Sequence, residues 1–175
     1  MPPTLQHYLT RVANIAISGS TVRNQGARGV VNACREFLQN EENIQNIFNN
    51  NDFQNQLNIT TTNLVMNLPN GAQNFGTARK AINVFLEECY YHREISNYFG
   101  VANLANLLEV PLDQDVANFL NANNNNAQLP HWHGIIHLTP DVSNCYQEFA
   151  MGFAMGLGDG WCRIHIDLLA WRHRG

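Results

Sequence analysis

Apolar side chains recur at three- and four-residue steps along most of this chain, which is the period of an amphipathic α-helix. The clearest stripe lies between Thr77 and Gly100 and comprises Ala78, Ile82, Phe85, Leu86, Cys89 and Tyr90. We predict a helix over about residues 77–99, capped by Thr77 and ended by Gly100 in a left-handed conformation. At about 1.5 Å per residue, this helix would be as long as a small domain is wide, so we expect it at the centre of the core.

Shorter helices are predicted on both sides of this long one. The apolar spacing and the helix-breaking residues place single helices at 2–17, 30–38, 101–108, 112–121 and from 140 onward. Two further helices are predicted within 41–68, with breaks near 49–51 and near 60–62. Leu68 to Gly71 reads as a turn, and residues 129–138 read as a loop.

The last segment, residues 161–173, fits either a strand or one face of a helix. No second convincing strand exists for it to pair with, so we favour a helix. The pattern therefore predicts an all-α fold, a single domain over residues 1–175 with six to eight helices around the helix at 77–99.

Composition narrows the classes of function. The chain has 26 asparagines, one lysine and a formal net charge of -4, so it shows no basic stripe of the kind that grips nucleic-acid phosphates. Nucleic acid is therefore a disfavoured partner. No apolar run reaches the roughly 20 residues that span a bilayer, and no signal peptide is evident, so we expect a cytoplasmic protein without membrane contact.

The four cysteines are far apart, and each lies in an apolar helical run. This distribution favours buried free thiols over disulfides or a metal framework. We expect no cofactor.

Lys80 and Asp113 are the first candidates for catalysis. The sequence places Leu68-Pro69 and Gly71 before a Gly76-to-Lys80 helix start, and Val110-Pro111-Leu112-Asp113 after it. This order resembles the helix-hairpin-helix DNA glycosylases over residues 68–120. The resemblance implies that Lys80 is a nucleophile that attacks the sugar, and that Asp113 stabilises the developing sugar cation. The alternative interpretation, without catalysis, is that Lys80 is a solvated helix residue and Asp113 a helix-capping acid.

A second resemblance covers most of the chain. Four segments, at 20–26, 78–86, 110–113 and 164–168, are similar to segments of bacterial mobile-element proteins known from integron gene cassettes. The resemblance supports the fold and implies no particular activity.

Histidines form a second candidate site. His131 and His133 lie two residues apart, and His165 and Asp167 lie on the last segment. Two histidines and a carboxylate can ligate a metal with one position left open. The spacing matches no standard motif, so our prediction for metal is none, with these residues as weak candidates. The competing interpretation is a surface loop around Trp132 and a buried, hydrogen-bonded His165.

Arg23, Gln25 and Arg28 lie among three glycines and form a third candidate site. Exposed backbone N–H groups beside arginines can hold an anion. The other interpretation, which we favour, is a tether in which Arg23 binds a carboxylate on a neighbouring helix, with Asp113 or Asp167 as the first partners to consider.

Three classes of function remain open, and the sequence does not decide whether the chain is an enzyme. The first, which we favour, is a small cytoplasmic binding or interaction module that self-associates as a homodimer, with aromatic side chains of the C-terminal third as its interface. The second is a DNA-processing, base-excision glycosylase-like enzyme, active or degenerate. The third is a histidine metal-binding protein.

Overall fold

The computed structural model describes residues 1–22, 25, 27–124 and 129–171. All regular elements in these ranges are helical, which confirms the predicted all-α class. They comprise nine α-helices, one more than the largest number expected, together with five short 3₁₀-helices. Within the described ranges, no helix is both long enough and apolar enough to cross a bilayer.

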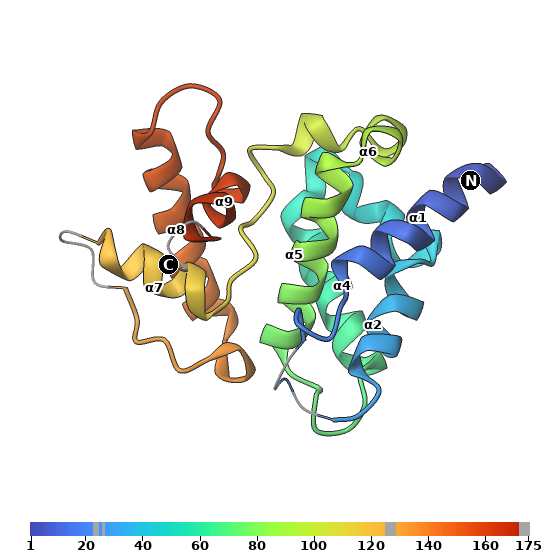
Figure 1. The fold of residues 1–175 in the computed structure, drawn as a ribbon, viewed down its shortest axis with the longest axis horizontal. Helices are drawn as coiled ribbons and strands as arrows, with labels where there is room; N and C mark the ends of the chain where they lie inside the picture. Colours follow the sequence, from blue (N-terminus) through green and yellow to red (C-terminus); the bar gives the residue numbers. More distant parts are fainter. Residues whose placement is uncertain (23–24, 26, 125–128, 172–175) are drawn as a thin grey trace.

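The first six α-helices form what we call the N-terminal group, on the right in Figure 1. They are α1 (Pro3–Ala16), α2 (Val30–Leu38), α3 (Glu41–Ile44), α4 (Phe53–Asn67), α5 (Phe75–Tyr91) and α6 (Arg93–Phe99), with the 3₁₀-helices η1 (Gln45–Phe48), η2 (Asn50–Asp52) and η3 (Val101–Leu104). Their apolar faces share one buried cluster, in which α5 packs against α1, α2, α4 and α6.

The remaining helices form the C-terminal group, on the left in Figure 1. They are α7 (Gln114–Ala122), η4 (Ile135–His137), α8 (Pro140–Gly156), η5 (Arg163–His165) and α9 (Ile166–Trp171). A second buried cluster holds α7, α8 and α9 together around Tyr146, which is fully buried. The two groups are joined by residues 105–113, which we call the connecting segment.

The long helix predicted over 77–99 is two helices in the structure, and this part of the prediction is wrong. The chain takes an extended conformation at His92, with φ -88° and ψ 103°, so that α5 ends at Tyr91 and α6 begins at Arg93. The His92 ring accepts a hydrogen bond from the Ile95 backbone N–H at 3.4 Å and packs against Tyr8 of α1. Histidine thus acts as a helix cap here, a role that apolar periodicity does not reveal.

The ends of these two helices are partly as predicted. Asn74, rather than Thr77, caps α5, because its side-chain oxygen accepts the Thr77 backbone N–H at 2.8 Å. Gly100, with φ 68°, ends α6 in the left-handed conformation that the sequence predicted. Only glycine adopts this conformation without a steric cost from a Cβ atom.

The predicted break at residues 60–62 is also wrong, because α4 continues through the three threonines. The hydroxyls of Thr61 and Thr62 donate to the carbonyls of Leu57 and Asn58, four residues earlier, at 2.6 and 3.1 Å. Threonine satisfies its hydroxyl within a helix in this way, instead of capping a new one. The expected break at 49–51 is confirmed by the extended backbone of Asn49.

All four cysteines are free, but they differ in environment. Cys34 and Cys89 are buried, as expected, whereas Cys145 is exposed and Cys162 is half-buried. The helix carrying Cys145 buries a different face, the one that includes Tyr146 and Ala150.

Candidate functional site

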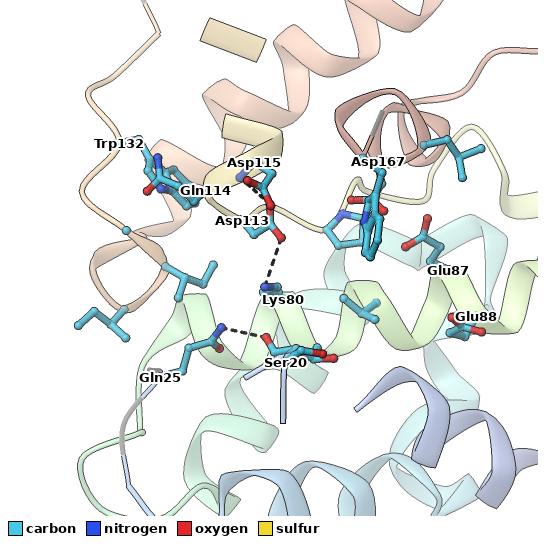
Figure 2. A pocket seen from close by; sticks show the side chains of 18 of the residues that line it. Ser20, Gln25, Lys80, Glu87, Glu88, Asp113, Gln114, Asp115, Trp132 and Asp167 are labelled. Carbon is cyan, nitrogen blue, oxygen red and sulfur yellow. Dashed lines mark hydrogen bonds and ion pairs between the residues drawn. The ribbon is translucent and has the colours of Figure 1, made fainter. Parts of the chain in front are cut away.

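A cleft of about 970 Å³ lies between the two helix groups. Its floor is one face of α5, and its lining residues there have helical spacing: Lys80, Val84, Glu87, Glu88 and Tyr91. The other walls come from the turn after α1, the start of α7, residues 132–137 and α9. Figure 2 shows Lys80 in the middle of this cleft, with Trp132 and Gln25 towards one end and Glu87 and Asp167 towards the other.

Lys80 and Asp113 meet in this cleft. The Lys80 ammonium Nζ lies 3.5 Å from the Asp113 carboxylate Oδ2 (Figure 2), and Lys80 is only 9% exposed. The interpretation of Lys80 as a solvated helix residue is therefore wrong. A lysine with so little exposed surface has lost most of its hydration, and the carboxylate supplies the compensating charge.

The two oxygens of the Asp113 carboxylate have different partners. Oδ1 accepts the backbone N–H groups of Asp115 and Val116 at 2.9 and 3.0 Å and so caps α7, while Oδ2 faces Lys80. The capping role expected from the sequence is confirmed, and it exists alongside the ion pair. Because the cap fixes the carboxylate plane, Oδ2 is held towards the cleft.

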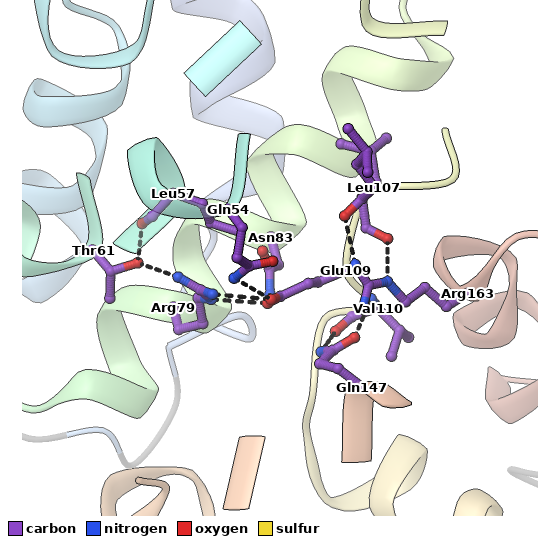
Figure 3. A network of polar contacts seen from close by, with 11 residues as sticks. Gln54, Leu57, Thr61, Arg79, Asn83, Leu107, Glu109, Val110, Gln147 and Arg163 are labelled. Carbon is purple, nitrogen blue, oxygen red and sulfur yellow. Dashed lines mark hydrogen bonds and ion pairs between the residues drawn. The ribbon is translucent and has the colours of Figure 1, made fainter. Parts of the chain in front are cut away.

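A buried polar network fixes the connecting segment that carries Asp113 (Figure 3). The Arg79 guanidinium donates to both oxygens of Glu109, from Nε to Oε2 at 2.8 Å and from Nη2 to Oε1 at 2.9 Å, and Asn83 donates to Oε2 at 2.9 Å. Arg79 and Asn83 flank Lys80 on α5. The network therefore ties the helix of the lysine to the segment of the aspartate.

Two further side chains hold the same segment from the C-terminal group. The Gln147 amide bonds both the N–H and the C=O of Val110, at 3.1 and 2.8 Å. Arg163 donates to the carbonyls of Leu107 and Leu108 at 2.6 and 2.9 Å. Backbone groups that no helix satisfies are thus paired with side chains from α8 and η5.

The other end of the cleft is acidic. Glu87, Glu88 and Asp167 line it, and burial, reinforced by the charges of Asp167 and Glu88, raises the pKa of Glu87 to about 8. Glu87 is therefore largely protonated at neutral pH, because a second buried negative charge beside Asp167 is unfavourable.

Gln25 is the member of the third predicted site that reaches the cleft. It is 3% exposed, its Nε2 donates to the Thr21 carbonyl at 3.0 Å, and its Oε1 is buried without a partner among the described residues. Arg28 is exposed, and Arg23 lies outside the described residues, so its predicted tether to Asp113 or Asp167 is not tested.

The candidate metal ligands do not gather into one site. The rings of His131 and His133 contact each other in the segment after α7, whereas the His165 ring packs against Tyr90 and Trp161. His165 accepts the Cys162 backbone N–H at 3.1 Å, and burial lowers its pKa. Across the described ranges, no three His, Cys, Asp or Glu side chains are placed to hold a metal ion.

Sequence reasoning missed Glu87, Tyr91 and Trp132 as cleft residues. The first two share a helix face with Lys80, at seven and eleven residues after it, and this spacing could have indicated them. No such signal exists for Trp132, because it comes from an irregular segment. Comparison of the chain with family models, with curated proteins and with solved structures finds no match.

Proposed function

We propose that the chain breaks N-glycosidic bonds of nucleic-acid components, with Lys80 as nucleophile and Asp113 as its charged partner. The observation that supports this proposal is the Lys80–Asp113 ion pair inside the cleft, 3.5 Å apart, with side chains that are 10% and 23% exposed. Lys80 follows the turn between α4 and α5, and Asp113 caps the next long helix after the connecting segment. These are the positions that the resemblance to helix-hairpin-helix glycosylases assigns to its nucleophile and its acid.

The chemistry follows from the geometry of the pair. The Lys80 ammonium must first lose a proton, and Asp113 Oδ2 is the base within reach. The free amine then attacks the anomeric carbon of the sugar and forms a C–N bond. The bond from that carbon to the base breaks, and the base leaves with the electron pair and takes up the proton that Asp113 holds. The bond from the same carbon to the ring oxygen then breaks with its electron pair on oxygen, which takes up one of the two remaining Nζ protons. A protonated imine between Nζ and the anomeric carbon results.

The Asp113 carboxylate has a second role in this scheme. Loss of the base puts positive charge on the sugar, and the carboxylate, which regains its negative charge as its proton passes to the leaving base, stabilises that positive charge. The cap on α7 holds this carboxylate in place through Oδ1, so little reorganisation is needed during the reaction.

The cleft accepts a single nucleotide better than a duplex. Its volume of about 970 Å³ is in the range of small-molecule sites. Enzymes that act on bases take the target nucleotide out of the stack, which requires such a pocket. The carboxylates of the lining repel phosphate groups, and added salt screens this repulsion, so we expect activity without the steep fall with salt that proteins with basic phosphate-binding surfaces show.

The test is reductive trapping at low salt on an oligonucleotide with one abasic site. Borohydride transfers hydride to the imine carbon and leaves a stable amine link between protein and oligonucleotide. Lys80 is the only lysine in the chain, so besides the N-terminus no other amine can be trapped. We expect a trapped complex with the wild type, none with Lys80→Gln, and at least about a hundredfold less with Asp113→Asn.

Two results would contradict the proposal. One is the absence of any trapped complex with the wild type on single-stranded and duplex abasic oligonucleotides. The other is a complex that persists in Lys80→Gln, which would place the link at the N-terminal amine of Met1. That amine pairs with Glu41 at 3.0 Å, at the distant end of α1.

Self-association is a second candidate, and one surface favours it. Met151 and Met155 lie one helical turn apart near the end of α8 and are 40% and 73% exposed, with Leu157 close behind. Exposed apolar side chains in a group are typical of protein interfaces. Light scattering should give the mass of a dimer for the wild type and of a monomer for Met155→Glu. A monomeric wild type at high concentration would refute this candidate.

A further inference from the structure

Gln25 lines the cleft and carries an unused hydrogen-bond acceptor, Oε1. Its Nε2 donates to the Thr21 backbone carbonyl at 3.0 Å, and this bond settles which end of the amide is nitrogen, because a carbonyl oxygen can only accept. The Oε1 atom therefore points away from Thr21. It is buried and has no partner among the described residues.

The surroundings of Gln25 are suited to a flat ring. The same end of the cleft is lined by Trp132, Ile135 and Ile136, which offer aromatic and apolar surface. The indole Nε1 of Trp132 is also buried without a partner in the described part of the chain. One acceptor and one donor without partners thus accompany a largely apolar wall, which is the composition of a site for a polar, planar ligand.

This wall is held in a fixed position next to Lys80. The segment that carries it passes so close to the first turn of α5 that a Cβ atom at Gly76 would overlap the Ile135 carbonyl oxygen. Gly76 lies one helical turn before Lys80. The nucleophile and the wall are therefore parts of one rigid arrangement, and a ring seated against the wall lies beside the ammonium group.

We propose that this end of the cleft binds a nucleobase, with Gln25 Oε1 accepting a ring N–H of the base. The identification of the ring as a nucleobase rests on the proposed function, because the group that leaves the sugar must lie next to the nucleophile. Because Gln25 Oε1 is a buried acceptor in the free protein, it gains a partner only from a ligand whose ring has a hydrogen-bond donor facing this atom. A ligand with a methyl group in place of that hydrogen leaves Oε1 unpaired and adds a steric clash.

The first experiment measures binding and requires no catalysis. Wild-type protein is titrated with two matched pairs of nucleosides, inosine with 1-methylinosine and uridine with 3-methyluridine, each pair differing only in a ring N–H. Quenching of tryptophan fluorescence reports occupancy, because Trp132 and Trp171 line the cleft. We expect the parent nucleoside of at least one pair to bind about tenfold or more tightly than its methylated partner.

The variant Gln25→Met keeps the side-chain length and removes the acceptor. We expect it to lose the preference within each pair, while Gln73→Met keeps it. Gln73 is a matched control, because its amide also donates to a backbone carbonyl, that of Leu68 at 3.0 Å, but outside the cleft. Equal binding of parent and methylated nucleosides by the wild type, or no binding of any of the four, would overturn the proposal even if Gln25→Met failed to fold.

The second experiment separates base recognition from the lysine chemistry. Trapping on an abasic oligonucleotide involves no base, so we expect Gln25→Met to lose less in this assay than in base release. Release of a base from an intact nucleotide should fall about tenfold or more in the same variant. Equal losses in both assays would show that Gln25 has only a structural role. If the wild type forms no trapped complex with the oligonucleotide, the proposed lysine chemistry is refuted. The nucleoside titration then decides by itself whether this end of the cleft binds a nucleobase.

Discussion

Arg79 and Glu109 form two parallel hydrogen bonds, at 2.8 and 2.9 Å, and each residue is only 2% exposed. The remaining guanidinium nitrogen Nη1 donates to Thr61 at 2.9 Å, and Gln54 donates to Glu109 at 3.3 Å. The guanidinium and the carboxylate therefore both have further hydrogen-bond partners among the side chains of α4 and α5. The pair joins the N-terminal group to the connecting segment four residues before Asp113.

Removing one member of this pair should be strongly destabilising. Glu109→Ala leaves the Arg79 guanidinium buried without a counter-charge, which costs about 3–5 kcal/mol of unfolding free energy. Glu94→Ala is the matched control, because the Arg93–Glu94 pair has the same length of 2.8 Å but side chains that are 85% and 42% exposed. Its loss should cost about 0–1 kcal/mol. Urea unfolding checks both values, and equal costs would contradict the assigned role of burial.

The same pair should make stability depend on pH in the acid range. Burial alone would raise the pKa of Glu109, but the charge of Arg79 and the hydrogen bonds from Arg79 and Asn83 hold it below the ordinary value of 4.5. The stabilisation is therefore complete above pH 4.5 and is lost as the pH falls through the lowered pKa. We expect unfolding free energy to decline below about pH 4.5 in the wild type and much less in Glu109→Gln.

Glu87 should produce the opposite slope at higher pH. Its pKa of about 8 in the folded protein exceeds the ordinary 4.5, so between these values the folded state holds a proton that the unfolded chain releases. Stability from this group is thus present at low pH and falls as the pH rises from 4.5 to 8. Glu87→Gln should have a flatter profile and a higher melting temperature at pH 8 than the wild type. An unchanged slope would show that Glu87 is ionised at neutral pH.

Two glycine substitutions should have opposite effects. Gly76→Ala places a Cβ atom on the Ile135 carbonyl oxygen, so the wall of the cleft must move, at a cost of about 1–3 kcal/mol. Gly152→Ala, inside α8, meets nothing within 4 Å and should stabilise the protein by about 0.5–1 kcal/mol. Thermal unfolding measures both. A neutral Gly76→Ala would mean that residues 132–137 are not held against α5.

Two substitutions of Asp113 should distinguish its role as the N-cap of α7 from the role of its charge. Asparagine caps helices as well as aspartate, so Asp113→Asn should retain α7 and lose only the stability that the charge facing the nearly buried Lys80 contributes. Asp113→Ala loses both hydrogen bonds to the α7 backbone and should cost a further ~1 kcal/mol. Circular dichroism and urea unfolding compare the two variants. Equal stability of both would show that the cap contributes nothing.

The sequence alone determined most of the helical segments, although it assigned residues 135–137, which form η4, to a loop. Helix starts at Pro3 and Pro140, the start at Val30 and the left-handed stop at Gly100 follow from local signals: proline at the first turn, apolar spacing and glycine. These signals act within a few residues, so one chain suffices to find them. The same locality explains the errors at His92 and at Thr61. Their side chains can serve a helix interior or a helix end, and neighbouring helices decide which.

Only the tertiary structure decided which residues line the same cleft. The sequence indicated Lys80 and Asp113 together because the order of motifs around them resembles that of the helix-hairpin-helix glycosylases, and it indicated Gln25 for a different site. Their proximity depends on how residues 105–113 are held by Glu109, Val110 and the side chains that bind them. Contacts between residues far apart in sequence leave no periodic trace. The burial of Lys80, the raised pKa of Glu87 and the unused acceptor of Gln25 arise only when the two helix groups pack together.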